Sequence, residues 1–134
     1  MINRIGFCCK WLNDPSEFGG MKVNAQDRDL NGRSTTMRWL REHADQAEQR
    51  QWDIMNHNAA AALKMVERVG SLAPERRMVR LGSEMLQGHT EPSWIDWWQR
   101  REIQDHCEQI FSPVGDAARR LGVRLSFHPG QFCV

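Results

Sequence analysis

The stretch IQDHCEQIFSPVGDAARRLGVRLSF, residues 103–127, joins a helical pattern directly to a strand pattern. Its apolar residues recur on one side of a helix that ends near residue 121, and Gly122 follows as a helix cap. Pro113 lies inside this helix, so we expect a kink or break near Phe111. Residues 123–127 form a short apolar run that predicts a strand. A helix that leads straight into a buried strand is typical of alternating α/β folds.

Two further apolar runs, residues 4–9 and 77–82, predict two more strands nearer the N-terminus. The order strand, helix, strand, helix, strand predicts parallel β-α-β units, because each helix is long enough to return the chain. A (β/α)8 barrel, or TIM barrel, typically needs ~250 residues. We therefore predict an α/β fold in which residues 1–134 supply the first three β/α units of a single TIM-barrel domain, truncated after the third strand.

The first helical region is expected to begin at Met37, with Ser34 or Thr35 as its N-cap. It is heavily charged as far as about residue 51, so this helix is expected to be mostly exposed. The next stretch has apolar residues near helical spacing and ends in a glycine: Ile54, Ala61, Met65, Val69 and Gly70. Before these helices, residues 12–34 form a long polar loop with several glycines, and such loops are usually functional or mobile.

The composition excludes several classes of protein. Of the 134 residues, 40% are hydrophobic and 26% are charged, with 18 Lys and Arg against 17 Asp and Glu. The hydrophobic content is too high for disorder, no apolar run approaches the ~20 residues of a membrane span, and a net charge of +1 gives no global attraction to nucleic acid. The four cysteines lack the spacing of a disulfide framework or a zinc knuckle, and no secretory signal pattern is present, so we expect a cytoplasmic protein.

Polar and aromatic side chains follow the third predicted strand in residues 127–132, FHPGQF. His128 falls at the carboxyl end of the strand, where barrel enzymes place their reacting groups, and Pro129 favours an extended backbone before it. Gln131 and Phe132 add an amide and an aromatic ring that can hold a flat ligand with polar edges. The alternative is an ordinary strand-end turn with a hydrogen-bonded histidine, because a single histidine is a weak signal for a metal.

A second histidine, His89, follows the second predicted strand in residues 87–92, QGHTEP. If the second and third strands are neighbours, their carboxyl-end loops meet, and His89 and His128 can share one metal ion. The alternative for His89 is an ordinary position on a surface loop. Glu84 is a further candidate ligand or base, with an exposed loop carboxylate as its alternative. The histidines within helical segments are expected to face solvent: His43, His57 and His106.

Residues 127–132 resemble the His-Pro-Gly-Gln-Tyr segment of the UV damage endonucleases, and three further stretches agree with that family in order. Residues 4–7, RIGF, are similar to the family's opening strand, Arg-Leu-Gly-Tyr. Residues 33–38 resemble the Arg-Thr-x-Arg stretch that opens its first helix. Residues 80–82, RLG, followed by His89, are similar to its second strand and loop histidine. The resemblance covers the whole chain, and the His-Pro-Gly-Gln segment is its specific part.

This resemblance implies a TIM barrel that holds a cluster of divalent metal ions, usually manganese, and that nicks damaged double-stranded DNA on the 5′ side of a pyrimidine dimer or other lesion. By the same resemblance, His89 and His128 are metal ligands, while Gln131 and Phe132 probe the duplex opposite the lesion. Phe7 is a further lesion-probing residue. Phe7 and Phe132 stand where the family usually has tyrosine, so they keep the ring and lose the hydroxyl.

The N-terminal region supplies basic residues that we expect to contact the DNA backbone: Lys10, Arg33 and Arg38. Trp11 lies about where the family has a lesion-contacting asparagine, so the chain departs from the family at this position. The family's remaining ligands come from later strands and would lie beyond Val134. The catalytic residues are therefore not assigned, and residues 1–134 alone are expected to be inactive.

Two other functions remain open at the level of sequence. A sugar-isomerase-like barrel also uses divalent metals at the same face, but Gln131 and Phe132 have no clear role in an open-chain sugar site. A non-catalytic DNA-binding relative would keep the barrel and lose the metals. Later strands ending in Glu, His and Asp would favour the nuclease.

Overall fold

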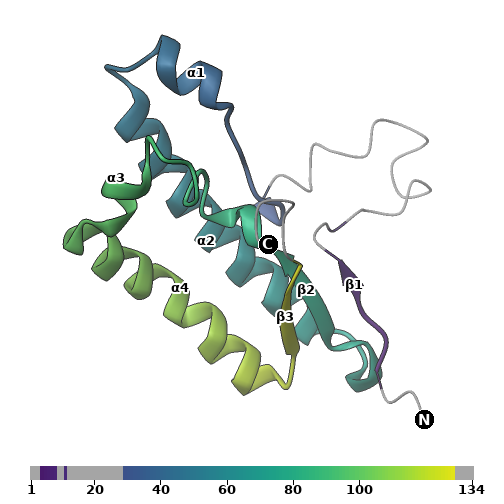
Figure 1. Ribbon diagram of the computed structural model, residues 1–134. Coiled ribbons are helices and arrows are strands. Elements are labelled where there is room, and N and C mark those ends of the chain that lie inside the picture. The colour runs from purple at the N-terminus through teal and green to yellow at the C-terminus, as the bar shows by residue number, and fades with distance from the viewer. Residues whose placement is uncertain (1–3, 9–10, 12–28, 129–134) are drawn as a thin grey trace, which may run out of the picture.

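The computed structural model describes residues 4–8, 11 and 29–128. Within these ranges the fold is a mixed α/β arrangement around a three-stranded parallel sheet (Figure 1). The strands β1 (Phe7–Cys8), β2 (Met78–Gly82) and β3 (Arg124–His128) lie side by side in the order β1-β2-β3. The predicted parallel β-α-β order is confirmed, and the bounds of β2 and β3 differ from the predicted ones by no more than one residue.

The parallel register places the carboxyl ends of β2 and β3 at the same end of the sheet. Gly82, the last residue of β2, lies opposite His128, the last residue of β3. Successive side chains of a strand point to opposite faces. Val79 and Leu81 are buried toward the helices, whereas Arg80 between them is exposed on the other face.

In the described ranges, four α-helices accompany the sheet: α1 (Met37–Glu42), α2 (Ala47–Gly70), α3 (Ile95–Gln99) and α4 (Arg101–Leu121). Two short 3-10 turns flank β2, namely η3 (Pro74–Arg76) and η4 (Ser83–Met85). None of these helices combines the length and the apolar character needed to cross a membrane.

The single helix predicted from Met37 to about residue 51 is two helices, α1 and α2, separated by a turn. His43 ends α1 because its backbone leaves the helical region, with φ −123° and ψ 52°. The Trp39 carbonyl accepts from both the backbone N–H and Nδ1 of His43, each at 3.0 Å, so the side chain adds to the last helical hydrogen bond. A side chain that bonds its own helix end in this way is not visible in the spacing of apolar residues.

The N-cap of α1 differs from the predicted one, whereas the C-cap of α4 is the predicted glycine. Thr36, and not Ser34 or Thr35, is the N-cap of α1, because its Oγ1 accepts a hydrogen bond from the backbone N–H of Trp39 at 3.1 Å. Gly122 caps α4 in the left-handed conformation, with φ 66°, as predicted.

Pro113 lies inside α4, but the helix continues without interruption from one end to the other. The break predicted near Phe111 is therefore wrong. Proline lacks the N–H that would reach the carbonyl four residues earlier, here that of Gln109. Both Pro113 and Gln109 are exposed, so water can bond to this carbonyl and the helix tolerates the proline.

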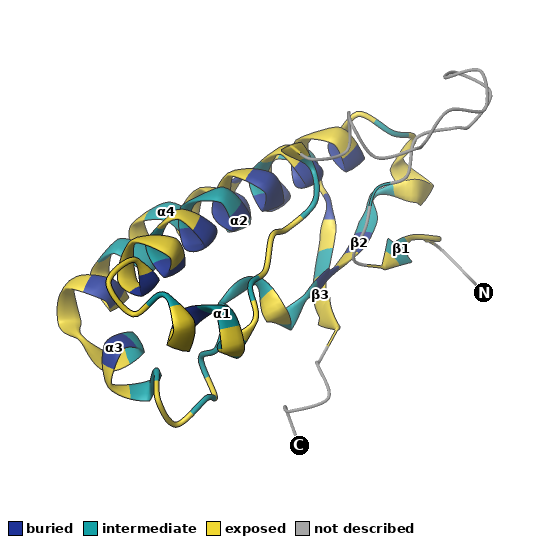
Figure 2. Ribbon diagram, turned by 90° about the horizontal axis from the view of Figure 1, so that it is seen from above, coloured by how far each residue is buried: buried dark blue, intermediate teal, exposed yellow. Residues whose placement is uncertain are grey.

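Two clusters of buried side chains form the core, and the inner sides of α2 and α4 are buried (Figure 2). The larger cluster joins both helices to β2 and the start of β3: Ala62, Met65, Val66, Val69, Val79, Leu81, Val114, Ala117, Ala118 and Val123. The smaller joins α2, α3 and α4: Met55, Trp97 and Ile103. Gly70 allows α2 and α4 to approach closely, because a Cβ there would lie 2.6 Å from Cδ1 of Leu121.

We expect residues 1–134 alone to self-associate, because in the described part of the chain β3 pairs with β2 alone and leaves its other edge unpaired. Phe127 on this strand is 57% exposed and adds apolar surface. Light scattering over a concentration series should show a rising mass, and Phe127→Lys should lower it, since a charged edge residue opposes strand pairing. A monomer with a sharp cooperative melt at every concentration would contradict this expectation.

Candidate functional site

The candidate site lies beyond the carboxyl ends of β2 and β3, where Gly82 and His128 are opposite each other. His128 is exposed at this end of the sheet. On the neighbouring strand, the chain passes from Gly82 through η4 into a loop that contains His89. The two predicted metal ligands are therefore placed beyond adjacent parallel strands, as the sequence predicted from their order.

A tight turn holds His89 in a defined orientation. Gly88 adopts a left-handed conformation with φ 68°, and the backbone N–H of His89 donates to the carbonyl of Leu86 at 3.3 Å. The ring Nδ1 of His89 also lies 2.8 Å from this carbonyl oxygen. Because a carbonyl can only accept, Nδ1 carries a proton, and in the neutral ring Nε2 keeps a lone pair that can bind a metal ion.

A pocket of about 560 Å³ opens beside this turn. Its walls come from the loop before α1 and from the segment after β2: Ser34, Thr35, Met37, Ser83, Glu84, Leu86, Gln87, Gly88, His89, Thr90, Glu91 and Pro92. Glu84 and His89 thus lie on one pocket, but His128 is not among its walls. Glu84 also borders a second pocket of about 230 Å³, together with Arg33 and the buried Asn58.

The described residues do not complete a metal site. Within residues 4–8, 11 and 29–128, no three His, Cys, Asp or Glu side chains are grouped closely enough to hold a metal ion. The sharing of one ion by His89 and His128 therefore stays a prediction.

Two buried amides of α2, Asn58 and Gln51, hold the walls of the pockets, and sequence reasoning missed both. Asn58 is 2% exposed; its Oδ1 accepts from the Arg33 N–H at 2.7 Å, and its Nδ2 donates to the carbonyls of Arg33 and Met85 at 3.1 and 2.9 Å. Gln51 is fully buried and donates to the carbonyl of Gln87 at 3.1 Å. The signal was available, because the two amides are two helical turns apart within the buried stripe of α2.

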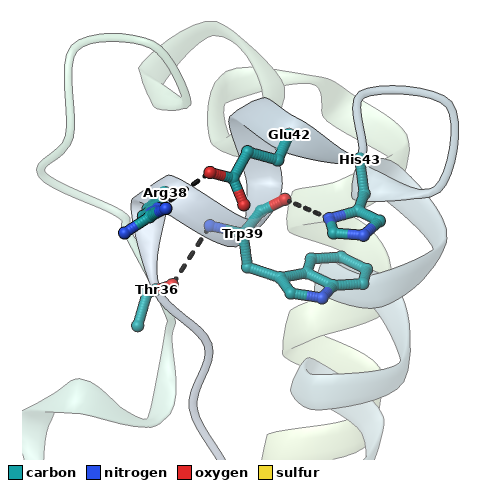
Figure 3. Close-up of polar contacts among 5 residues, drawn as sticks. All are labelled: Thr36, Arg38, Trp39, Glu42 and His43. Carbon is teal, nitrogen blue, oxygen red and sulfur yellow. Dashed lines mark hydrogen bonds and ion pairs between the residues drawn. The ribbon is translucent and has the colours of Figure 1, made fainter.

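Two of the predicted DNA-backbone contacts lie before and within α1. Arg33 is exposed while Asn58 fixes its backbone. Arg38 pairs with Glu42 across one turn of α1, with 2.7 Å between Nε and Oε1, and both side chains are largely exposed (Figure 3). An exposed pair of this kind contributes little to stability, so Arg38 can exchange Glu42 for a phosphate. The third predicted contact, Lys10, lies outside the described residues.

Of the predicted lesion-probing residues, Gln131 and Phe132 lie outside the described residues. Phe7 lies in β1, where it is half-buried and packs against the edge of the larger core cluster. Its ring meets that of Trp11 edge-on, with 5.4 Å between centroids. This packing gives Phe7 a structural role beside the probing role that the resemblance implies.

The sequence predicted that the histidines within helical segments face solvent, and this prediction is wrong. His43, His57 and His106 are half-buried, and each is hydrogen-bonded. His57 Nε2 donates to the carbonyl of Asn31 at 3.0 Å, and the His106 ring stacks on a tryptophan of α2.

Burial raises the pKa of the Cys107 thiol, which opposes formation of a nucleophilic thiolate there.

A scan against models of protein families found no match, and neither did searches of curated proteins and of solved structures.

Proposed function

We propose that the protein is a metal-dependent endonuclease that nicks double-stranded DNA on the 5′ side of UV lesions such as pyrimidine dimers. The observation that supports this best is the geometry of His89. In the neutral ring its Nε2 keeps a lone pair, His89 and Glu84 line one pocket after β2, and the neighbouring strand β3 ends in His128. The proposal includes that β1, β2 and β3 are the first strands of a TIM barrel, and that the protein acts in the cytoplasm.

The residue types at this end of the sheet suit a divalent metal such as Mn²⁺, which accepts imidazole and carboxylate ligands. His89 and His128 would hold it. When bound, the metal polarises the phosphate and lowers the pKa of a bound water, which phosphodiester hydrolysis requires. Around it, Arg33 and Arg38 would neutralise backbone phosphates, together with Lys10.

Nicking of supercoiled plasmid tests this proposal directly. The full-length protein should convert UV-irradiated plasmid to the open circle with manganese chloride and should leave it intact with EDTA. Mapping on an oligonucleotide with one pyrimidine dimer should place the break on the 5′ side of the lesion. Specific binding to damaged duplex without any nicking would instead support a non-catalytic DNA-binding relative. Absence of both would reject the proposal.

Phe132→Ala in the full-length protein is expected to weaken binding to damaged duplex by ~5- to 150-fold, since stacking of a base on an aromatic ring contributes roughly 1–3 kcal/mol. Binding to undamaged duplex should change much less, because it depends on phosphate contacts. The measurement is the ratio of the two affinities for a folded variant. If Phe132 were merely a core residue, the variant would lose stability with its lesion preference unchanged.

A further inference from the structure

The turn that positions the His89 ring is held by side chains from two helices, α2 and α3. We infer that Gln51 of α2 and Trp98 of α3 are positioning residues, which fix the turn at Gln87 and thereby set the tautomer and direction of the His89 imidazole. The consequence for metal binding rests on the proposed role of His89 as a ligand.

The first step is the carbonyl of Gln87, which accepts two hydrogen bonds. Gln51 Nε2 donates to it at 3.1 Å and Trp98 Nε1 at 3.0 Å. A carbonyl oxygen has two lone pairs, so these donors satisfy it completely. Gln51 is fully buried, and its Oε1 has no hydrogen-bond partner among the described residues. The bond to Gln87 is therefore what this buried amide contributes to the structure.

The second step is the turn itself, which rests directly on Gln51. A Cβ added to Gly88 would lie 3.4 Å from Gln51 Nε2 and 2.9 Å from Cε of Met37, so the glycine backbone fits closely over these side chains. The side chain of Gln87 donates from Nε2 to the carbonyl of Thr35 at 2.9 Å. The turn is thus held from beneath by α2 and α3 and from the side by the segment before α1.

The third step transfers this constraint to the imidazole. The carbonyl of Leu86, next to Gln87, accepts from both the backbone N–H and Nδ1 of His89. If the turn is fixed, this carbonyl is fixed, and so is the ring that bonds to it. Free histidine side chains favour the opposite tautomer, with the proton on Nε2. The turn therefore selects the tautomer in which Nε2 can act as a ligand.

Nitrogen NMR of the His89 ring tests the inference without any metal or DNA. In mildly alkaline buffer, where a histidine ring is neutral, the wild-type protein should show the Nδ1–H tautomer. Gln51→Met removes the donor and also the unpartnered Oε1 while keeping a similar volume, and Trp98→Phe removes the Nε1–H and keeps an aromatic ring. Each variant should shift His89 toward a mixture of tautomers, and the double variant should shift it furthest.

Val66→Ala provides the control, because Val66 is fully buried on α2 in the larger core cluster and has no part in the turn. It should lower the melting temperature and leave the His89 tautomer unchanged. A folded double variant with the wild-type tautomer would overturn the inference, and so would an equal shift in Val66→Ala. Trp98→Phe alone decides the question if Gln51→Met does not fold.

Broadening of the His89 signals by manganese chloride separates this inference from the proposed function. Binding in the wild type and weaker binding in the two variants would support both. A tautomer that responds to the variants in a protein that does not bind manganese would support positioning and reject the metal site.

Discussion

Alanine at His89 or at His128 is expected to abolish manganese-dependent nicking by the full-length protein and to leave binding to duplex DNA largely intact. His128 ends β3, and His89 lies in the loop after the adjacent strand β2, where its Nδ1 bonds to a carbonyl and Nε2 of the neutral ring keeps a lone pair. In the proposed nuclease, loss of one ligand would remove the metal or displace it from the scissile phosphate, whereas duplex affinity would depend on basic residues elsewhere. Plasmid nicking, metal content and a gel-shift assay measure the three quantities.

His106→Ala is the matched control for these variants. This histidine is also half-buried and hydrogen-bonded, but it stacks on Trp52 and bonds to Asn56, away from the proposed ligands. It should keep its nicking activity once corrected for folded protein. Normal activity in His89→Ala or His128→Ala would remove that residue from the metal site.

Asn58→Ala should lower the free energy of unfolding by about 2–4 kcal/mol, because it leaves three partly buried backbone groups without their partner. These groups are the N–H and carbonyl of Arg33 and the carbonyl of Met85. The loss should be visible in urea denaturation. Hydrogen exchange should also quicken at the amide of Arg33, because Asn58 Oδ1 is its acceptor.

Asn56→Ala serves as the comparison, since it removes the same side chain from the same helix. Asn56 is half-buried and donates to the carbonyl of Trp52 at 2.8 Å. Its loss should cost about 1 kcal/mol or less, with the Arg33 amide unchanged. Equal costs for the two variants would mean that Asn58 does not hold the loop before α1 in the way its hydrogen bonds indicate.

The parts of the fold that follow from apolar periodicity could be predicted from the sequence. Residues 78–82 and 124–128 are strands because short apolar runs there are flanked by polar residues, and Gly122 ends its helix through the left-handed backbone that glycine adopts most easily. The split between α1 and α2 could not be predicted, because the non-helical backbone of His43 and its side-chain bond to Trp39 leave no trace in the spacing of apolar residues. The tolerance of Pro113 likewise depends on solvent reaching Gln109.

The sequence predicted which strands the candidate site residues follow, but not the hydrogen bonds that support them. Parallel strand order was enough to place His89 and His128 beyond neighbouring strands. The support beneath His89 could not be derived that way, because Gln51 and Trp98 meet Gln87 only after α2 and α3 have packed. Residue spacing shows which side chains share a helix face, whereas hydrogen bonds between distant elements depend on how those elements dock.

The parallel register also determines the order in which the chain can fold. Phe7 in β1 pairs opposite Val79, a partner more than half of the chain away, and no hairpin can bring the two together. Closing so long a loop is slow compared with forming α2 or α4, whose hydrogen bonds are local. During synthesis, β1 leaves the ribosome first and must wait unpaired until β2 has been made. A chaperone would therefore bind the nascent protein most readily during that interval.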